Sequence, residues 1–138
     1  MQSQVGLTRD EMAIWTWLVS KGITQSLTGL SQMVGQELIV NSMEMQEYPI
    51  SETPNLLGGA ENIVVGTYLA ISGDAEGHLV LVHQPKIAFD LIDIQMGQEP
   101  GTTNTMQEME RSVIGEIGNI TASFFLGAIA DATGLLLM

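Results

Sequence analysis

The sequence predicts an α+β fold in which two long helices pack on one face of an antiparallel sheet. Apolar residues recur at helical spacing in two segments, about 8–34 and 106–132. Between them, residues 62–71 and 78–83 have the composition of strands, and the six-residue loop Ser72–Gly77 joins them as a hairpin. Two helices that flank a hairpin are typical of the α+β class.

The first half of the chain contains clear helix signals. Thr8 is the expected N-cap of the first helix, because Glu11 follows three residues later and completes a capping box. Gly35 is the expected stop. The following segment, Leu38–Tyr48, is predicted to be a strand that ends at Pro49, and residues 51–60 a loop rich in Pro, Gly and Asn.

The second half ends in the second long helix. Pro85 suits the first turn of a short helix over Lys86–Met96, and residues 97–104 are predicted to form a loop. The last helix runs from about Met106 to Ala132 and ends at Gly134. Residues 135–138 would start another strand.

The two long helices look like copies of each other, related by a shift of 99 residues. The shift places Gly35 on Gly134 and Leu38 on Leu137. Any two amphipathic helices align to some extent, but a shared glycine stop followed by an apolar strand start favours a repeat. We therefore predict one domain over residues 1–138, with a first repeat at about 8–98 and an incomplete second repeat at about 105–138. By analogy with the first copy, roughly sixty residues are absent, so we expect a fragment of a longer chain.

The charge balance and the lack of cysteine exclude several classes of function. Lys and Arg number 4 against 16 Asp and Glu, a net charge of −12 that repels nucleic acid and anionic lipid. Thiolate nucleophiles, disulfides and cysteine-based metal sites are excluded. Asp131 interrupts the apolar stretch 120–138, and Asp10 and Glu11 precede the first apolar run, unlike a signal peptide. We expect a cytoplasmic protein with no membrane insertion.

A narrow polar stripe on the last helix carries the candidate chemistry. At about 100° per residue, Ser112, Glu116, Asn119 and Ser123 fall within an arc of about 60°. A solvated face more often contains oppositely charged pairs four residues apart, whereas Asn119 stands mid-helix, where its propensity is poor. The residues alone nevertheless favour an ordinary helix surface over a site.

The electrostatics of the stripe point to a partner. A lone carboxylate repels phosphate, and a free-standing phosphatase needs a metal or a basic clamp. The stripe contains neither, since Arg111 points about 100° away from Ser112. The stripe therefore suits a phosphoryl group on a partner protein that brings its own cation and lysine. Glu116 would pair with that lysine, and Asn119 would orient a water.

Two glycines interrupt the same helix. Gly115 and Gly118 each cost about 1 kcal/mol relative to alanine. They permit either close approach of another backbone beside the stripe or tight packing on the sheet, and the sequence leaves both interpretations open.

The run Ser112–Ile120 resembles the signature of the CheC/CheX/FliY phosphatases of bacterial and archaeal chemotaxis: Asp or Ser, three residues, Glu, two residues, Asn. The chain is most similar to CheC, over about residues 8–138. The resemblance implies a CheC-like pseudo-two-fold fold and hydrolysis of the aspartyl phosphate of a CheY-like response regulator. It gives Glu116 the contact to the receiver's lysine and Asn119 the attacking water, with Ser112 in support. Mg²⁺ would come from the receiver, so no cofactor or metal of its own is expected.

The chain departs from the family pattern in two places. The family usually carries the motif on both helices, but the equivalent triplet on the first helix is Ala13, Trp17 and Ser20. This copy lacks Glu and Asn and should be inactive, with Trp17 a packing or contact residue. The family also has a Pro after the Asn, at a position beyond Met138, which supports truncation.

A different class of function stays open beside the enzyme. A family member could be a binding module that docks a receiver, the CheD deamidase or a flagellar switch component without strong catalysis. The two histidines do not suggest a metal enzyme. His78 and His83 stand five apart on a strand and face opposite sides, so we expect one to be packed, the other exposed, and no shared metal.

Overall fold

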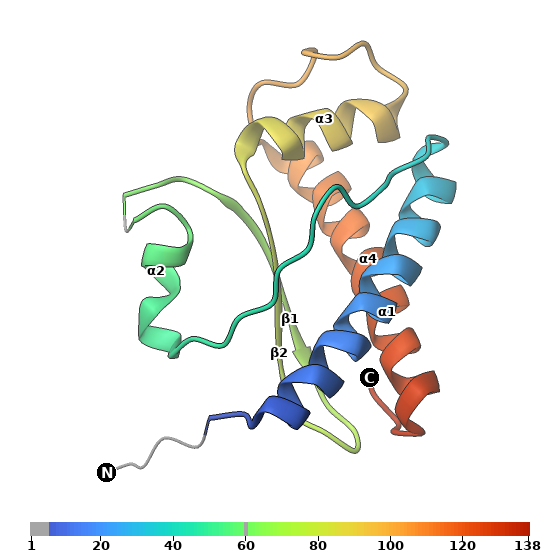
Figure 1. Cartoon of the computed structure of the whole chain (residues 1–138). Coiled ribbons are helices and arrows are strands. Elements are labelled where there is room, and N and C mark those ends of the chain that lie inside the picture. The colour runs from blue at the N-terminus through green and yellow to red at the C-terminus, as the bar shows by residue number, and fades with distance from the viewer. Residues whose placement is uncertain (1–5, 60) are drawn as a thin grey trace.

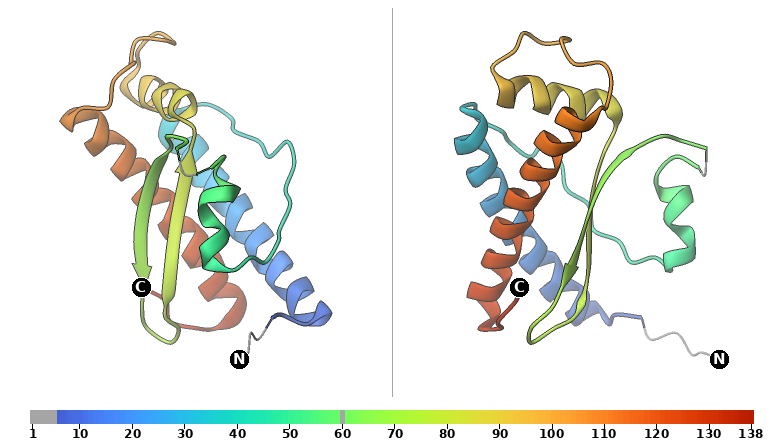
Figure 2. Two further views of the ribbon diagram at one scale, coloured as in Figure 1. Left: turned by 90° about the vertical axis from the view of Figure 1, so that its left-hand side faces the viewer. Right: turned by 180° about the vertical axis from the view of Figure 1, so that it is seen from behind.

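The computed structural model describes residues 6–59 and 61–138. In chain order its elements are α1 (Arg9–Val34), η1 (Ile50–Glu52), α2 (Thr53–Leu56), β1 (Val65–Ile71), β2 (Gly77–His83), α3 (Pro85–Met96) and α4 (Glu108–Thr133). The long helices α1 and α4 pack side by side, and α3 crosses one end of the pair (Figure 1). Figure 2 shows both long helices on one side of the hairpin and α2 on the other. The predicted α+β fold is confirmed.

Local signals fix the ends of the long helices as expected. The Thr8 Oγ1 accepts a hydrogen bond from the Glu11 amide at 3.1 Å, and Glu11 Oε1 accepts one from the Thr8 amide at 2.9 Å, so the capping box is complete. Gly35 ends α1 and Gly134 ends α4, both in the left-handed conformation, with φ of 73° and 76°. Glycine adopts this conformation without steric cost, which is why both helices stop there.

The hairpin has the predicted antiparallel pairing. Val65 lies opposite His83 and Ile71 opposite Gly77, and exposure alternates along both strands. The first strand begins at Val65, three residues later than predicted. The last residues of the chain also pair, as expected for a strand start: Met138 and Ser72 exchange backbone hydrogen bonds of 2.9 and 3.0 Å, beside a bridge between Gly73 and Leu137.

Two predictions for residues 38–60 are wrong. In the described part of the chain, Leu38–Tyr48 forms no strand, and Ile39 and Val40 are 69% and 44% exposed. An extended segment becomes a strand only when a neighbouring edge takes up its backbone groups, and the one hydrogen bond recorded for its backbone is from the Leu38 amide to Ser31 Oγ, at 2.9 Å. The expected loop 51–60 contains two short helical turns, η1 and α2, with Pro54 in the first turn of α2; Ala60 lies outside the described residues.

The core lies where α1, α3 and α4 meet. Its buried cluster is Leu30, Val34, Ala88, Leu91, Ile92, Ile114 and Ile117. Ile92 and Ile117 are almost wholly buried and together fix α3 against α4. This packing sets which face of α4 is left for solvent.

Beyond this core, α1 and α4 approach each other closely, because two glycines of α1 face phenylalanine rings of α4. Gly22 lies against the ring of Phe125 and Gly29 against that of Phe124, and a Cβ at either glycine would overlap the ring. Among the described residues, α4 is also the one helix long and apolar enough to cross a membrane, with 28% of the tested window buried. A helix that packs in the core of a soluble fold meets the same test, so length and composition decide nothing here.

Candidate functional site

Helix α4 presents two distinct faces. Its buried face consists of Ile114, Ile117, Gly118, Ala122 and Ile129. The opposite face carries Ser112, Glu116, Asn119 and Ser123, all exposed. The structure therefore places the whole predicted stripe on the outer surface of the helix pair. A capping box fixes the start of this helix: the Gln107 amide donates to Glu110 Oε1 at 3.0 Å.

The two glycines of the stripe have different surroundings. A Cβ at Gly118 would lie 2.6 Å from Thr67 Cγ2 on β1, so Gly118 is needed for packing on the hairpin. A Cβ at Gly115 would meet nothing within 4 Å. No contact inside the described chain accounts for a glycine at position 115.

The side chains of Glu116 and Asn119 are available for external contacts. Among the described residues, neither is recorded in a hydrogen bond or an ion pair; Ser123 Oγ donates to the backbone carbonyl of Asn119 at 2.9 Å, not to its side chain. Three residues of helix separate the two groups by about 4.5 Å along the axis. A carboxylate and an amide at this spacing can bind a cation and a water of one partner.

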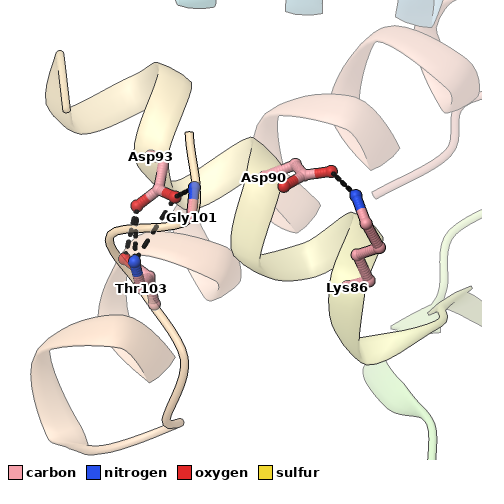
Figure 3. A network of polar contacts seen from close by, with 5 residues as sticks. All are labelled: Lys86, Asp90, Asp93, Gly101 and Thr103. Atoms are coloured by element: carbon pink, nitrogen blue, oxygen red, sulfur yellow. Dashed lines mark hydrogen bonds and ion pairs between the residues drawn. The ribbon is translucent and has the colours of Figure 1, made fainter. Parts of the chain in front are cut away.

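Among the described residues, no ion pair to Glu116 is recorded. The ion pair recorded among them joins Lys86 and Asp90 on α3, at 3.1 Å between Nζ and Oδ2, and both side chains are exposed (Figure 3). The described residues also contain no group of three or more His, Asp or Glu side chains that could hold a metal ion. A phosphoryl group at Glu116 would therefore need positive charge from another molecule.

The equivalent stripe on α1 is exposed too, but its chemistry differs. Ala13 and Trp17 are exposed, while Ser20 is half-buried and donates from Oγ to Met43 Sδ at 3.6 Å. Trp17 is 51% exposed and Trp15 is 44% exposed, so a large part of each ring is open to contact from outside.

Lys21 was missed by the sequence analysis. Its Nζ lies 5.0 Å from the centre of the Trp17 ring, a cation–π distance. The signal was present, because residues four apart on a helix are neighbours.

The histidines lie on opposite faces of β2, as predicted. His78 is exposed and stacks on Tyr68, with ring centroids 5.5 Å apart. His83 is half-buried, and burial lowers the pKa of its imidazole below the usual 6.5. Its Nδ1 is buried and has no hydrogen-bond partner.

Asp93 holds the loop that leads into α4, and it too was missed. Its buried carboxylate accepts hydrogen bonds from the Gly101 amide at 3.1 Å, the Thr103 amide at 3.0 Å and Thr103 Oγ1 at 2.6 Å (Figure 3). The signal was an Asp that stands between two isoleucines in the sequence, Ile92 and Ile94. These three hydrogen bonds, which we call the Asp93 clamp, fix the segment that leads into α4, the helix with the polar stripe.

Comparison with known proteins gives two results. The profile of the CheC-like family matches residues 109–135, the segment that contains Ser112, Glu116 and Asn119. The CheY-P phosphatase CheC of Bacillus subtilis (strain 168) is 25% identical over 132 residues, which cover 94% of this chain and 63% of that protein. The resemblance to CheC predicted from the sequence is thus confirmed. The chain spans less than two thirds of the length of this curated relative.

Proposed function

We propose that the chain is a protein aspartyl-phosphate phosphatase that acts on a CheY-like response regulator in chemotaxis. One observation carries the proposal: the exposed, internally unpartnered pair Glu116 and Asn119 lies in the segment similar to the CheC-like family. The similarity to a protein named CheY-P phosphatase supplies the class of partner. We also propose that the reaction takes place in the cytoplasm.

The proposed mechanism divides the active centre between two proteins. The receiver holds the aspartyl phosphate, Mg²⁺ and a lysine, and Glu116 pairs with that lysine across the interface. The Asn119 side-chain amide accepts a hydrogen bond from the attacking water and donates one to it. These two bonds hold the water oxygen in line with the phosphorus. The water oxygen bonds to phosphorus as the bond to the aspartate oxygen breaks, releasing inorganic phosphate, a proton and the free carboxylate. Positioning of this kind can lower a barrier by several kcal/mol.

The exposed surface around the pair suits this docking. Ser112 lies one turn before Glu116 and adds a hydroxyl to the same face. Gly115 leaves the helix backbone uncovered next to Glu116, so the receiver's backbone can approach closely. No step of the mechanism needs a metal bound by this chain.

The test measures loss of phosphoryl label from a purified receiver with and without the protein. We expect acceleration by the wild type and its loss in Asn119→Ala, with binding retained. The matched control is Asn104→Ala, an exposed asparagine outside the stripe, which should behave as the wild type. Binding without any acceleration by the wild type would favour the non-catalytic docking module instead.

A second variant tests the pairing of Glu116 with the receiver. Glu116→Lys places like charges across the interface and should weaken receiver binding by about tenfold or more. Unchanged affinity would remove Glu116 from the proposed mechanism.

A further inference from the structure

A groove of about 920 Å³ runs between α1 and α4 on the outer side of the helix pair. Trp17, Lys21 and Thr24 line it from α1, and Ser123, Gly127 and Asp131 from α4. Gly127, Ala128 and Ala132 add little bulk to its α4 wall, and a Cβ at Gly127 would meet nothing within 4 Å. The groove therefore presents an indole, an ammonium and a carboxylate on one concave surface.

Trp17 and Lys21 form a prearranged pair at its edge. The Trp17 ring is 51% exposed and is covered by the Lys21 ammonium, 5.0 Å from its centre. Lys21 forms no ion pair with any residue that the structure describes. An exposed tryptophan contributes little to the fold, whereas tryptophans in pockets carry a large share of binding energy at protein interfaces.

The groove continues the polar stripe of α4. Ser123 belongs to both, since it lines the groove and its Oγ donates to the carbonyl of Asn119. The helices pack antiparallel, with Ser26 at the level of Thr121, so Trp17 lies about eleven residues beyond Asn119, or about 16 Å along α4. A domain of about 100 residues has a radius of gyration of about 13 Å, so one docked domain covers both points.

We propose that Trp17 and Lys21 are a second contact for the same phosphorylated receiver. Trp17 anchors an apolar side chain of the receiver in the groove, and Lys21 pairs with one of its carboxylates. With Glu116 on a receiver lysine, the two opposite charges fix the direction in which the receiver lies across the helix pair. The stripe on α1, which contains Ala13, Trp17 and Ser20, thus serves docking and not catalysis. This inference rests on the proposed function.

The first test separates docking from chemistry. In the full chain, Trp17→Ala should raise the KM for the phosphorylated receiver by about tenfold, because an aromatic anchor is lost, while kcat stays within about twofold. Lys21→Glu should raise KM as well, and Trp17→Phe should restore most of the affinity. Trp15→Ala is the matched control, since Trp15 is 44% exposed but does not line the groove, and it should leave KM unchanged.

A second measurement does not depend on catalysis. Equilibrium binding of the phosphorylated receiver is measured for Asn119→Ala with and without Trp17→Ala, and we expect about tenfold weaker binding of the double variant. If Trp17→Ala changes neither KM nor affinity, or if Trp15→Ala has the same effect, the inference is overturned while the phosphatase stands. If the wild type binds the receiver through Trp17 but does not hydrolyse its aspartyl phosphate, the docking role is supported and the proposed phosphatase function is overturned. A wild-type dimer that Trp17→Ala converts to a monomer assigns the groove to a second copy and overturns the inference.

Discussion

Ser26 on α1 donates a hydrogen bond from its Oγ to the backbone carbonyl of Thr121 on α4, at 2.9 Å. One turn away on each helix, Gly22 lies against the ring of Phe125. The shift of 99 residues that relates the two helices exchanges these contacts, because it places Gly22 on Thr121 and Ser26 on Phe125. The helices therefore cross as equivalent halves, which is the relation that a pseudo-two-fold repeat requires.

Removing the Ser26 hydroxyl tests how much this crossing contributes to stability. Ser26 is almost fully buried, so Ser26→Ala should lower the free energy of unfolding by about 1 kcal/mol, the usual net value of one hydrogen bond. Urea denaturation followed by circular dichroism measures it. Thr28→Ala is the control, since the exposed Thr28 bonds only within its own helix, and its effect should stay below about 0.5 kcal/mol. Equal effects of the two substitutions would contradict the assigned role.

The two glycines of α4 provide a matched pair. Gly118→Ala places a methyl group 2.6 Å from Thr67 Cγ2 and should destabilise the fold by about 1–3 kcal/mol, despite the better helix propensity of alanine. Gly115→Ala meets no atom and should stabilise the fold by up to about 1 kcal/mol. Melting temperatures of the two variants give the comparison. If both respond alike, the packing of α4 on β1 is not as described.

Gly115→Ala also tests the proposed approach of the receiver. A methyl group beside Glu116 keeps a partner backbone away, so this better-folded variant should dephosphorylate the receiver several-fold more slowly. Activity that rises with stability would show that Gly115 has no part in docking.

The elements that the sequence predicted correctly depend on neighbours in the chain. The capping box of Thr8 and Glu11 and the stops at Gly35 and Gly134 are local signals, and all three appear in the structure. The stripe was predictable for the same reason, because helical spacing alone brings Glu116 and Asn119 to one face.

The failures concern contacts made at a distance. The composition of Leu38–Tyr48 is that of a strand, but a strand forms only where a neighbouring edge takes up its backbone groups. Among the described residues the sheet consists of β1 and β2 alone, and Leu38–Tyr48 pairs with neither of them. The groove of Trp17 was hidden likewise, since its other wall comes from residues about a hundred positions away, near Asp131.

The Asp93 clamp should be among the more sensitive positions of the fold. Asp93→Ala removes the acceptor for two backbone amides and one hydroxyl in a buried site, which should cost about 3 kcal/mol. Asp93→Asn keeps one acceptor oxygen and should cost less. Because the loop leads into α4, hydrogen exchange of the amides of residues 98–112 should rise in Asp93→Ala before that of β1 and β2. Protection lost equally in all elements would mean that Asp93 supports the core alone.

The buried imidazole of His83 gives the fold a pH dependence with a definite sign. Burial lowers the pKa of His83 in the folded state, whereas the unfolded chain has the ordinary value of 6.5. The unfolded chain therefore binds a proton on His83 more readily than the folded chain does. As the pH drops through 6.5 towards the pKa of the folded state, the free energy of unfolding falls. Well above pH 6.5 His83 is neutral in both states and has no effect on the pH dependence of stability. Urea denaturation from about pH 7.5 to about pH 5.5 should show the loss in the wild type, above the range in which most carboxylates titrate.

His83→Leu isolates the contribution of this one side chain. The variant has no imidazole to protonate, and it does not break a hydrogen bond to Nδ1, which has no partner among the described residues. Its stability relative to the wild type should therefore increase steadily as the pH is lowered, whatever the offset between the two proteins at pH 7.5. A constant difference over the whole range would show that the proton on His83 binds the folded and unfolded chains equally well, and that burial of this ring is not what makes the fold sensitive to acid.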